Sequence, residues 1–496
     1  MALILGDQLS HANPALDGAD RVLMIESRAA LARLRYHRRR RHLVLSAMRH
    51  FAAELRDRGI EVDYVVSDDK RSVLARHRDV VAAQPNDGPA RRSLARAGVR
   101  YVPSTQFLTD VGAFTAWAEQ RPKRLVMEDF YRDQRRRLGL LMDGDRPAGG
   151  RWNLDKDNRE PPKEGMSPPL PWMPEEDDID AAVRRDLDAW GLEEFGEDGP
   201  REWPATAAEA RRALDDFIEH RLLDFGTYQD AMVPGERWMF HSRLSAAFNL
   251  WLLDPLEAAR AAERAYRDGR APLNAVEGFV RQVVGWREYV WCMYWLRERE
   301  WRTDNALEAT TPLAEVFWTG ETDLNCLRNA MHDVRESAYA HHILRLMILG
   351  NLHLLLGTRP WEAVEWFRAA FIDGAEWVMA PNVAGMATFA DGGVMMTKPY
   401  AAAGRYVHRM SHYCRDCRFV PERRTGEDAC PVTQLFWDFM ARNEERLAGN
   451  RRLRGQFASL RRMDPEELAE VRAAAEQVRE ALLAGRPIGE RPPPSP

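Results

Sequence analysis

Three cysteines late in the chain constrain the fold of this protein more than any other feature. Cys414, Cys417 and Cys430 follow the spacing Cys-x2-Cys-x12-Cys-Pro. Two thiolates three residues apart, with a third further on and followed by proline, are typical of metal or iron–sulfur ligation. The chain must therefore bring these thiols together around a common centre.

Three thiolates leave such a site one ligand short. Cys326 lies in a polar-flanked segment, whereas Cys292 lies inside the apolar run Val290-Trp291-Cys292-Met293, which is typical of a core. We therefore expect Cys326 to be the fourth ligand, and His412 is the alternative for zinc. The spacing alone does not decide between zinc and an iron–sulfur cluster.

The composition excludes several classes of protein. The five cysteines are odd in number and clustered, which argues against a disulfide framework and for a reducing cytoplasm. No apolar run approaches the roughly 20 residues of a membrane helix, and the first residues lack the regions of a signal peptide. The formal net charge of −5 is small for 496 residues, so binding to nucleic acid would need a local basic patch.

The first 120 residues alternate short apolar runs with helical patterns. Residues 3–5, 21–25, 42–45 and 62–66 are predicted strands, and residues 46–59 are a predicted helix. This alternation predicts a Rossmann-like α/β domain with a parallel sheet over residues 1–130. Asp7 directly follows the first strand, where such sheets bind ligands, although an ordinary turn is the alternative. The basic run at residues 37–42 is predicted to be a solvated face rather than a polyanion site.

Residues 131–205 are rich in proline and acidic residues and are expected to form an interdomain linker draped over the surface. Residues 206–496 are expected to form a large all-α domain, because nearly all of this region has helical periodicity. The predicted helices are 206–219, 243–253, 255–267, 274–295, 323–356 (broken), 361–371, 434–448 and 465–483. The proline-rich residues 491–496 are expected to be disordered.

A paired histidine and two charged residues precede the cysteines. His341 and His342 stand four and three residues before Arg345. Neighbouring residues on a helix point about 100° apart, so only one histidine can share the face of Arg345 closely. Histidine is the usual side chain for proton transfer near neutral pH, and a structural role for both is the alternative. If buried, Arg345 and Asp373 each need a partner, so they are predicted to pair.

The 16 tryptophans are unusually many for 496 residues. Core filling accounts for them, while an electron path between a buried redox cofactor and a metal cluster is the sharper interpretation. Trp318, Trp361, Trp366 and Trp377 fall in the region of interest. Hydroxyls and amides in residues 225–232 and 241–245 precede helix starts, which bind phosphate well.

Several motifs now form a familiar set. In chain order they are Ser242-Arg243-Leu244-Ser245, Arg281-Gln282, Trp286-Arg287-Glu288, His341-His342-x-x-Arg345, Trp366-Phe367 and Asp373-Gly374. They resemble the FAD-binding helical domain of the photolyase/cryptochrome superfamily. The cysteine set, with Leu5-Gly6-Asp7-Gln8-Leu9, Ser46-Ala47-Met48-Arg49-His50-Phe51 and Ala390-Asp391-Gly392-Gly393, resembles its iron–sulfur bacterial branch, the prokaryotic (6-4) photolyases.

This resemblance implies two cofactors in the helical domain. Cys326, Cys414, Cys417 and Cys430 would hold a 4Fe-4S cluster. FAD would lie near a set of residues from four helical segments: Gln229, Ser242, Leu244, Ser245, Gln282, Arg287, Arg345 and Asp373. Trp366, and beyond it Trp318, would carry electrons to the flavin.

The resemblance also implies a substrate and an antenna. His342 would protonate the (6-4) photoproduct with His341 beside it, and Tyr400 and Tyr406 would line the lesion pocket. The α/β domain, with Asp7, would bind 6,7-dimethyl-8-ribityllumazine as antenna. The basic residues Arg135, Arg136, Lys398 and Arg405 would contact DNA phosphates.

Three positions depart from the family pattern. Met379 stands near flavin N5, where relatives carry Asn or an acid, so flavin redox behaviour is expected to differ. Ala30 replaces an acid that would contact the antenna, and Phe367 stands where a tyrosine would also be usable for electron transfer.

The implied function is that of a (6-4) DNA photolyase, a cytoplasmic enzyme acting on UV-damaged DNA and expected to be a monomer without membrane association. The alternative is a cryptochrome-type blue-light photoreceptor with the same FAD and cluster, and a light-independent iron–sulfur DNA-binding protein is a third. The sequence does not distinguish repair from signalling in the cell.

Overall fold

A five-stranded parallel sheet forms the amino-terminal part of the computed structural model, which describes residues 1–488. Its strands lie in the order β3-β2-β1-β4-β5, so the winding direction reverses between β1 and β4. The predicted Rossmann-like α/β region is confirmed. The strands are β1 (Ala2–Ile4), β2 (Arg21–Ser27), β3 (Glu61–Ser67), β4 (Val81–Ala83) and β5 (Arg100–Val102).

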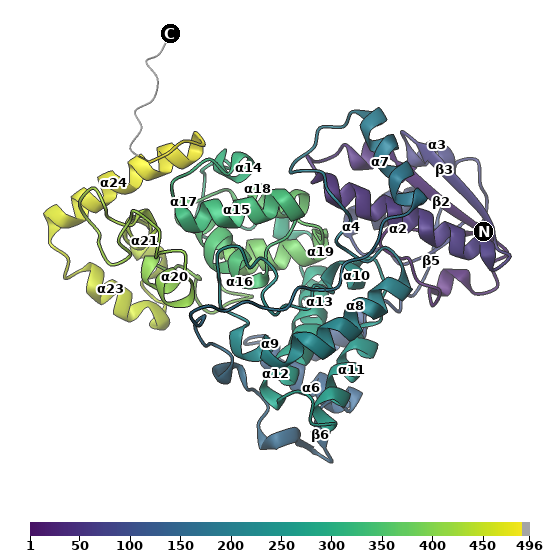
Figure 1. The fold of residues 1–496 in the computed structure, drawn as a ribbon, viewed down its shortest axis with the longest axis horizontal. Helices are drawn as coiled ribbons and strands as arrows, with labels where there is room; N and C mark the ends of the chain where they lie inside the picture. Colours follow the sequence, from purple (N-terminus) through teal and green to yellow (C-terminus); the bar gives the residue numbers. More distant parts are fainter. Residues whose placement is uncertain (489–496) are drawn as a thin grey trace, which may run out of the picture.

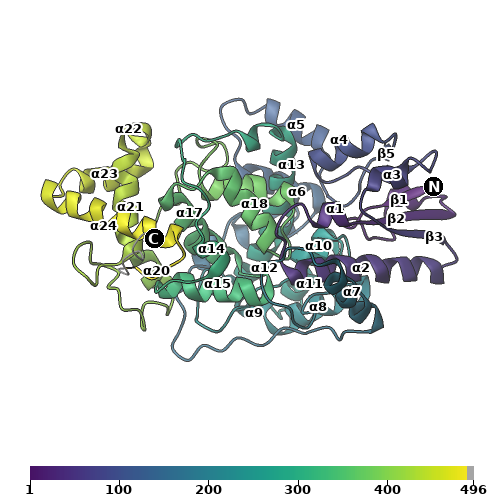
Figure 2. The same ribbon diagram turned by 90° about the horizontal axis from the view of Figure 1, so that it is seen from above.

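Helices cover both faces of this sheet (Figure 2). Leu3 and Leu23, paired across β1 and β2, pack with residues of α3 (Lys70–Leu74) and α4 (Gly88–Arg96). Ile4 and Met24 point to the opposite face and pack with α2 (Arg38–Asp57). Because side chains alternate along a strand, a sheet with helices on both faces needs nearly continuous apolar runs, which these strands have.

The predicted strand at residues 42–45 is wrong, because these residues belong to α2. The helix lies between the sheet and α7 (Asp178–Trp190), so it is apolar over more than one face and imitates a short buried strand. The prediction of a solvated face at residues 37–42 is also wrong. His37, Arg38, Arg41 and His42 are all buried, and Arg38 pairs with Asp188 of α7 at 2.5 Å.

The segment predicted as a linker runs across the helical part as an extended strap (Figure 1). Its predicted start falls inside α6 (Met127–Leu138), and it contains α7 before α8 (Ala207–His220) begins. The backbone N–H of Glu160 donates to the Thr227 carbonyl, and that of Trp172 donates to the Asp216 carboxylate at 3.0 Å. These hydrogen bonds hold the strap against α8 and α9 (Leu222–Tyr228).

The rest of the chain is helical, as predicted, and the helices predicted at 255–267 and 465–483 are confirmed as α11 (Pro255–Arg267) and α24 (Pro465–Leu483). The other main helices are α9 (Leu222–Tyr228), α10 (Ser245–Asn249), α12 (Leu273–Val280), α13 (Arg287–Leu296), α15 (Asn325–Ser337), α16 (His342–Leu344), α17 (Asn351–Leu356), α18 (Pro360–Ala370), α19 (Glu376–Met379), α20 (Gly404–Met410), α21 (Pro431–Arg442) and α23 (Arg454–Leu460). Residues 491–496 lie outside the described residues.

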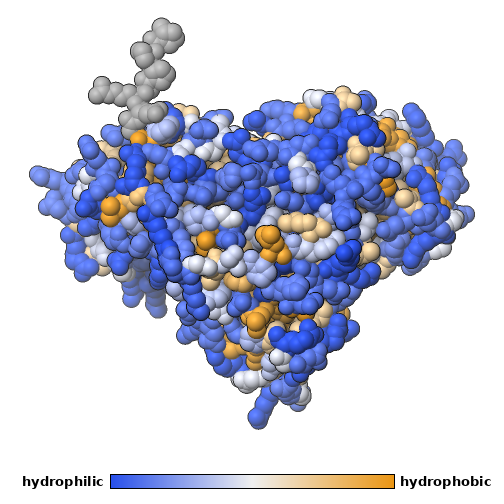
Figure 3. Space-filling model, viewed as in Figure 1, coloured by the Kyte–Doolittle hydropathy of each residue, from blue (hydrophilic) through white to orange (hydrophobic). Residues whose placement is uncertain are grey.

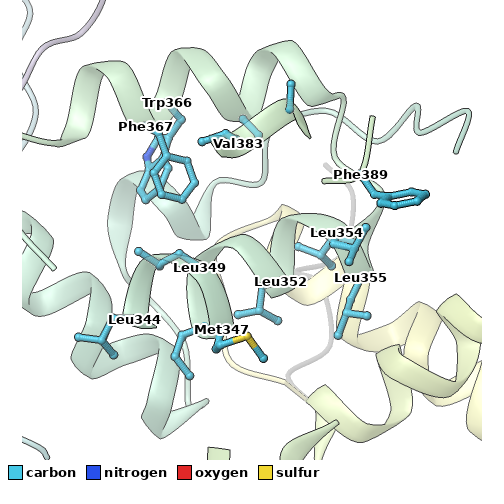
Figure 4. Close-up of a cluster of buried hydrophobic side chains, with 14 of the residues drawn as sticks. Leu344, Met347, Leu349, Leu352, Leu354, Leu355, Trp366, Phe367, Val383 and Phe389 are labelled. Atoms are coloured by element: carbon cyan, nitrogen blue, oxygen red, sulfur yellow. The ribbon is translucent and has the colours of Figure 1, made fainter. Parts of the chain in front are cut away.

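The main hydrophobic core lies where α17 and α18 meet (Figure 4). Leu349 and Leu352 lie below Trp366 and Phe367, which project from α18. The face shown in Figure 3 is mainly hydrophilic, with small scattered apolar patches. Within residues 1–488, no helix is long and apolar enough to cross a membrane.

Candidate active site

Three π-helices carry or adjoin the predicted site residues. They are η4 (Arg281–Trp286), η6 (Arg345–Gly350) and η7 (Ala380–Ala387). η4 joins α12 to α13, η6 joins α16 to α17, and η7 continues α19 to its end. Such π-helical turns are frequent at functional sites. Gly350 allows η6 and η7 to approach, because a Cβ there would lie 2.9 Å from that of Ala387. The predicted helix at 274–295 contains η4, and the one at 323–356 is broken after α15, as predicted, and contains η6 in its second part.

The predicted ion pair between Arg345 and Asp373 is present, at 2.8 Å. Burial alone would raise the pKa of the Asp373 carboxyl, but the Arg345 guanidinium and the Ser245 side chain hold that pKa below its ordinary value. The Asp373 backbone carbonyl accepts a hydrogen bond from Asn249 on α10. Gly374 is required next to it, since a Cβ there would lie 2.5 Å from a backbone oxygen. The pair is a buried, oriented charge site.

Three histidines, rather than the predicted two, meet beside this pair. His341 precedes α16 in extended conformation, and its ring stacks on His241 at 4.6 Å. Burial lowers the pKa of both rings well below the ordinary value, so both are neutral at pH 7. His342 points elsewhere: it is nearly half exposed, and its Nε2 lies 3.2 Å from the Asp230 carboxylate.

Asp230, the partner of His342, also lies near enough to the two predicted tyrosines to affect their pKa values. Burial, and after it the charge of Asp230, raises the pKa of Tyr406, and burial similarly raises that of Tyr400. Both rings are partly exposed. The tyrosines therefore stay protonated and can donate hydrogen bonds to a bound molecule, while Asp230 orients His342.

Two predicted cofactor ligands have buried polar atoms that lack a partner within the described residues, Gln229 Oε1 and Arg287 Nε. The same holds for His241 Nε2 and His341 Nδ1, which were not predicted to hold the cofactor. Buried polar groups normally have hydrogen-bond partners, so this set fits a polar ligand between the helices. Ser242 and Ser245 are partly exposed, Leu244 is buried, and Gln282 is exposed on η4. The donor set thus fits FAD, which presents both polar groups and a ring.

The predicted electron carriers differ in their surroundings. Trp366 is buried, and its indole N–H donates to the Phe317 carbonyl at 2.8 Å. Its ring is 5.8 Å from Phe371, which lies 4.2 Å from the Arg345 guanidinium. Trp318, the next residue along from Phe317, is partly exposed, with its ring 5.4 Å from the guanidinium of Arg35.

The four predicted metal ligands converge from three segments. Cys326 begins α15, Cys414 and Cys417 follow α20, and Cys430 immediately precedes α21. Burial, and then the nearby thiols of Cys430, Cys414 and Cys417, raises the pKa of Cys326 well above the ordinary value. Within residues 1–488, however, no three of these thiol sulfurs lie within 4.8 Å of one another.

The predicted antenna site contains a small cavity at the carboxyl ends of β1 and β2. Its volume is about 190 Å³, and its lining includes Gly6, Glu26, Ala30 and Met48. Asp7 lies beside the point where the strand order reverses, and its carboxylate accepts a hydrogen bond from Asn86 at 2.8 Å. Burial and the charge of Asp87 raise the pKa of Asp7 to about 6.

The predicted basic contacts divide into two groups. Arg135 is fully buried, and its guanidinium donates to backbone carbonyls of Leu140, Leu141 and Trp152. Its assignment to DNA phosphates is therefore wrong, because capping these carbonyls occupies the whole side chain. Arg136 and Arg405 are exposed, and Lys398 is partly exposed.

Comparison with known proteins identifies the family. The chain is 42% identical to a (6-4) photolyase of Agrobacterium fabrum over 96% of its own length and 98% of that protein. This chain belongs to the photolyase/cryptochrome superfamily, in the branch of the prokaryotic (6-4) photolyases. The family model for deoxyribodipyrimidine photo-lyase-related protein matches residues 2–203.

Solved photolyases share the fold at low sequence identity. A bacterial class III photolyase from Agrobacterium tumefaciens matches with a TM-score of 0.56 at 15% identity, over 97% of this chain and 88% of that one. An archaeal photolyase from Sulfolobus tokodaii, solved with two FAD molecules, matches with a TM-score of 0.52 at 14% identity, over 84% of this chain and 88% of that one. The α/β and all-α architecture is that of photolyases.

Two residues of this photolyase-family site were missed by the sequence reasoning. Asp230 and His241 both lie in segments singled out for their polar groups, but neither was assigned a role. Asp230 follows a helix without a recognisable motif around it, and its partner His342 lies 112 positions away. The sequence near Asp230 therefore does not indicate its role. Met379 is buried at the end of α19, and Ala30 lines the cavity; the effects expected of these two departures stay predictions.

Proposed function

We propose that this chain is a DNA repair enzyme that reverses (6-4) pyrimidine photoproducts by light-driven electron transfer, with His342 in proton transfer. The observation that carries the proposal is the pairing of a partly exposed His342 with Asp230, close to the buried Arg345–Asp373 pair. A proton donor at the surface and an oriented charge site behind it are the two groups that this reaction needs, because it moves both a proton and an electron.

FAD, when bound, supplies the photoexcited electron donor. The residues that would hold it are Gln229, Ser242, Leu244, Ser245, Gln282, Arg287, Arg345 and Asp373. The buried polar atoms of Gln229 and Arg287 support this assignment, because they would otherwise lack partners. The Arg345 guanidinium keeps Asp373 ionised. The pair would therefore present one positive and one negative charge to the flavin ring. Trp318 would pass electrons from the surface to Trp366, and Trp366 would pass them to the flavin.

The substrate side is formed by His342, Tyr400 and Tyr406. A lesion that already disrupts stacking costs less to extrude from the duplex than an intact base pair. His342 would deliver its proton to the extruded lesion and become neutral, while Asp230 would hold the imidazole ring in position. The neutral ring of His341, which stacks on His241, would pack behind His342. Arg136, Lys398 and Arg405 remain as candidates for phosphate contacts, which make binding salt-dependent.

For the cysteines we propose a 4Fe-4S cluster held by Cys326, Cys414, Cys417 and Cys430. The resemblance to the iron–sulfur branch of the family supports a cluster over a single zinc ion, and the four thiols lie near enough to one another to raise the pKa of Cys326. The cluster would tie the segment after α20 and the start of α21 to α15.

The remaining assignments extend the same proposal. A ribityl-lumazine antenna would use the cavity beside Glu26, although about 190 Å³ is below the roughly 300 Å³ at which ligand pockets usually begin, so side chains such as Met48 must move. The protein would act in the cytoplasm as a monomer.

A repair assay tests the proposal directly. Purified protein with reduced FAD is illuminated together with an oligonucleotide that contains one (6-4) photoproduct, and the lesion is quantified by chromatography. Light-dependent loss of the lesion is expected. Bound and reduced FAD without any loss would reject repair in favour of the blue-light photoreceptor, and a protein that binds no flavin would reject both.

A further inference from the structure

A continuous row of three tryptophans lies outside the path through Trp366. Trp377 belongs to α19, and Trp291 and Trp295 belong to α13, which packs on α19. The ring centroids of Trp377 and Trp291 are 5.8 Å apart, and those of Trp291 and Trp295 are 5.6 Å apart. Both pairs meet edge to face, an arrangement of aromatic rings in direct contact.

The inner end of this row lies at the proposed flavin site. Trp377 is four residues after Asp373, and its ring centroid is 5.5 Å from the guanidinium of Arg287. Phe107 fixes the geometry, because it stacks on Trp291 at 3.7 Å and meets Trp377 edge to face at 4.9 Å. Trp377 and Trp291 are both buried. A charge on either ring is therefore shielded from water until it leaves the row.

The outer end of the row reaches the surface. Trp295 is partly exposed, unlike the other two rings. The guanidinium of Arg91, on α4 of the α/β domain, lies 5.4 Å from its ring and holds it between the two parts of the molecule. Exposure thus increases along the row from the proposed flavin site outward, as required of a path that ends at a soluble electron donor.

We infer that Trp377, Trp291 and Trp295 form a second electron path from the surface to the flavin site, parallel to the path through Trp366. The inference rests on the proposed FAD site. In each cycle, Trp377 gives one electron to the light-excited oxidised flavin. Trp291 refills Trp377, and Trp295 refills Trp291. A soluble thiolate then reduces Trp295, and two of the resulting thiyl radicals combine to a disulfide, so the electrons balance.

Photoreduction of the full-length FAD-loaded protein tests the path. The rate is followed from the visible absorbance of oxidised flavin under blue light with a thiol reductant. Trp366→Phe is expected to leave a measurable rate of flavin photoreduction, because the second path still carries electrons. Adding Trp291→Phe should lower this rate about tenfold further, because both paths are then interrupted. Equal rates in the single and double variants would overturn the inference.

Trp301→Phe is the matched control. Trp301 is as buried as Trp377, and its ring lies 5.2 Å from the Arg297 guanidinium; among the described residues it has no ring contact with the row. This control should not change the rate in the Trp366→Phe background. Should Trp291→Phe fail to fold, Trp295→Phe at the partly exposed end must give the same loss, and an unchanged rate there would equally reject the path.

A second readout does not depend on turnover. Illumination in air without thiol should leave oxidised Trp295, detected by peptide mass spectrometry, in the Trp366→Phe protein but not after Trp291→Phe is added. Oxidation of Trp295 that persists in the double variant would reject the path. Lesion repair by chemically reduced Trp291→Phe protein should be intact, which separates failure of this path from failure of the proposed repair function.

Discussion

Removing the guanidinium of Arg345 is expected to reverse the pH dependence of stability contributed by Asp373. The two charges are 2.8 Å apart, and the side chain of Asp373 is only 8% exposed. Arg345→Met keeps much of the aliphatic volume but leaves a buried carboxylate without its partner. Breaking a buried pair in this way costs roughly 3–5 kcal/mol of the free energy of unfolding.

The sign of the pH effect follows from the pKa of Asp373. In the native protein this pKa lies below its ordinary value, so the stabilisation is present above about pH 4 and is lost only as pH falls through the folded pKa. In Arg345→Met, burial of the carboxyl outweighs the remaining hydrogen bond from Ser245 and raises the folded pKa. The variant therefore loses stability as pH rises from about 4 towards the raised pKa, by up to about 1.4 kcal/mol per pH unit.

Urea unfolding at about pH 5 and about pH 8 measures this difference. The double variant Arg345→Met with Asp373→Asn is the control, because it disturbs the flavin site equally but buries no charge. The single variant should be clearly less stable than the double variant at the higher pH and approach it at the lower pH. Equal stability of the two variants at both pH values would refute the reasoning.

Three further predictions concern the cysteines and the substrate side. Cys417→Ser should lose iron and lower the thermal midpoint of unfolding, because metal ligation contributes directly to folding. Cys292→Ala, at a cysteine outside the proposed cluster, is the control. Iron retained by Cys417→Ser would contradict the assignment. Gly404→Ala would place a Cβ 2.7 Å from Cys430 Sγ. We expect it to cost about 1–3 kcal/mol and to reduce iron content, measured by urea unfolding and metal analysis, and an unchanged protein would show that α20 can shift freely. His342→Ala should abolish (6-4) repair while FAD absorbance is retained, and repair at the native rate would remove the proton-transfer role.

Much of the fold was predictable from residue type and spacing. The cysteine spacing, with the polar flanks of Cys326, selected four thiols that the structure places near one another, and their role as metal ligands stays a prediction. Strand and helix alternation predicted a parallel sheet, because periodicity reports directly which side chains are buried. The pairing of Arg345 with Asp373 followed from the rule that a buried charge needs a partner.

Other features depended on the tertiary structure alone. Local pattern cannot show which surface will cover a helix, so α2 with its buried arginines was read partly as a strand and partly as a solvated face. The π-helices η4, η6 and η7 were not predicted from the helical periodicity of their segments. The contacts of His342 with Asp230 and of Trp377 with Trp291 join distant positions. Periodicity records how deeply each residue is buried, whereas the packing of whole helices decides which buried groups meet.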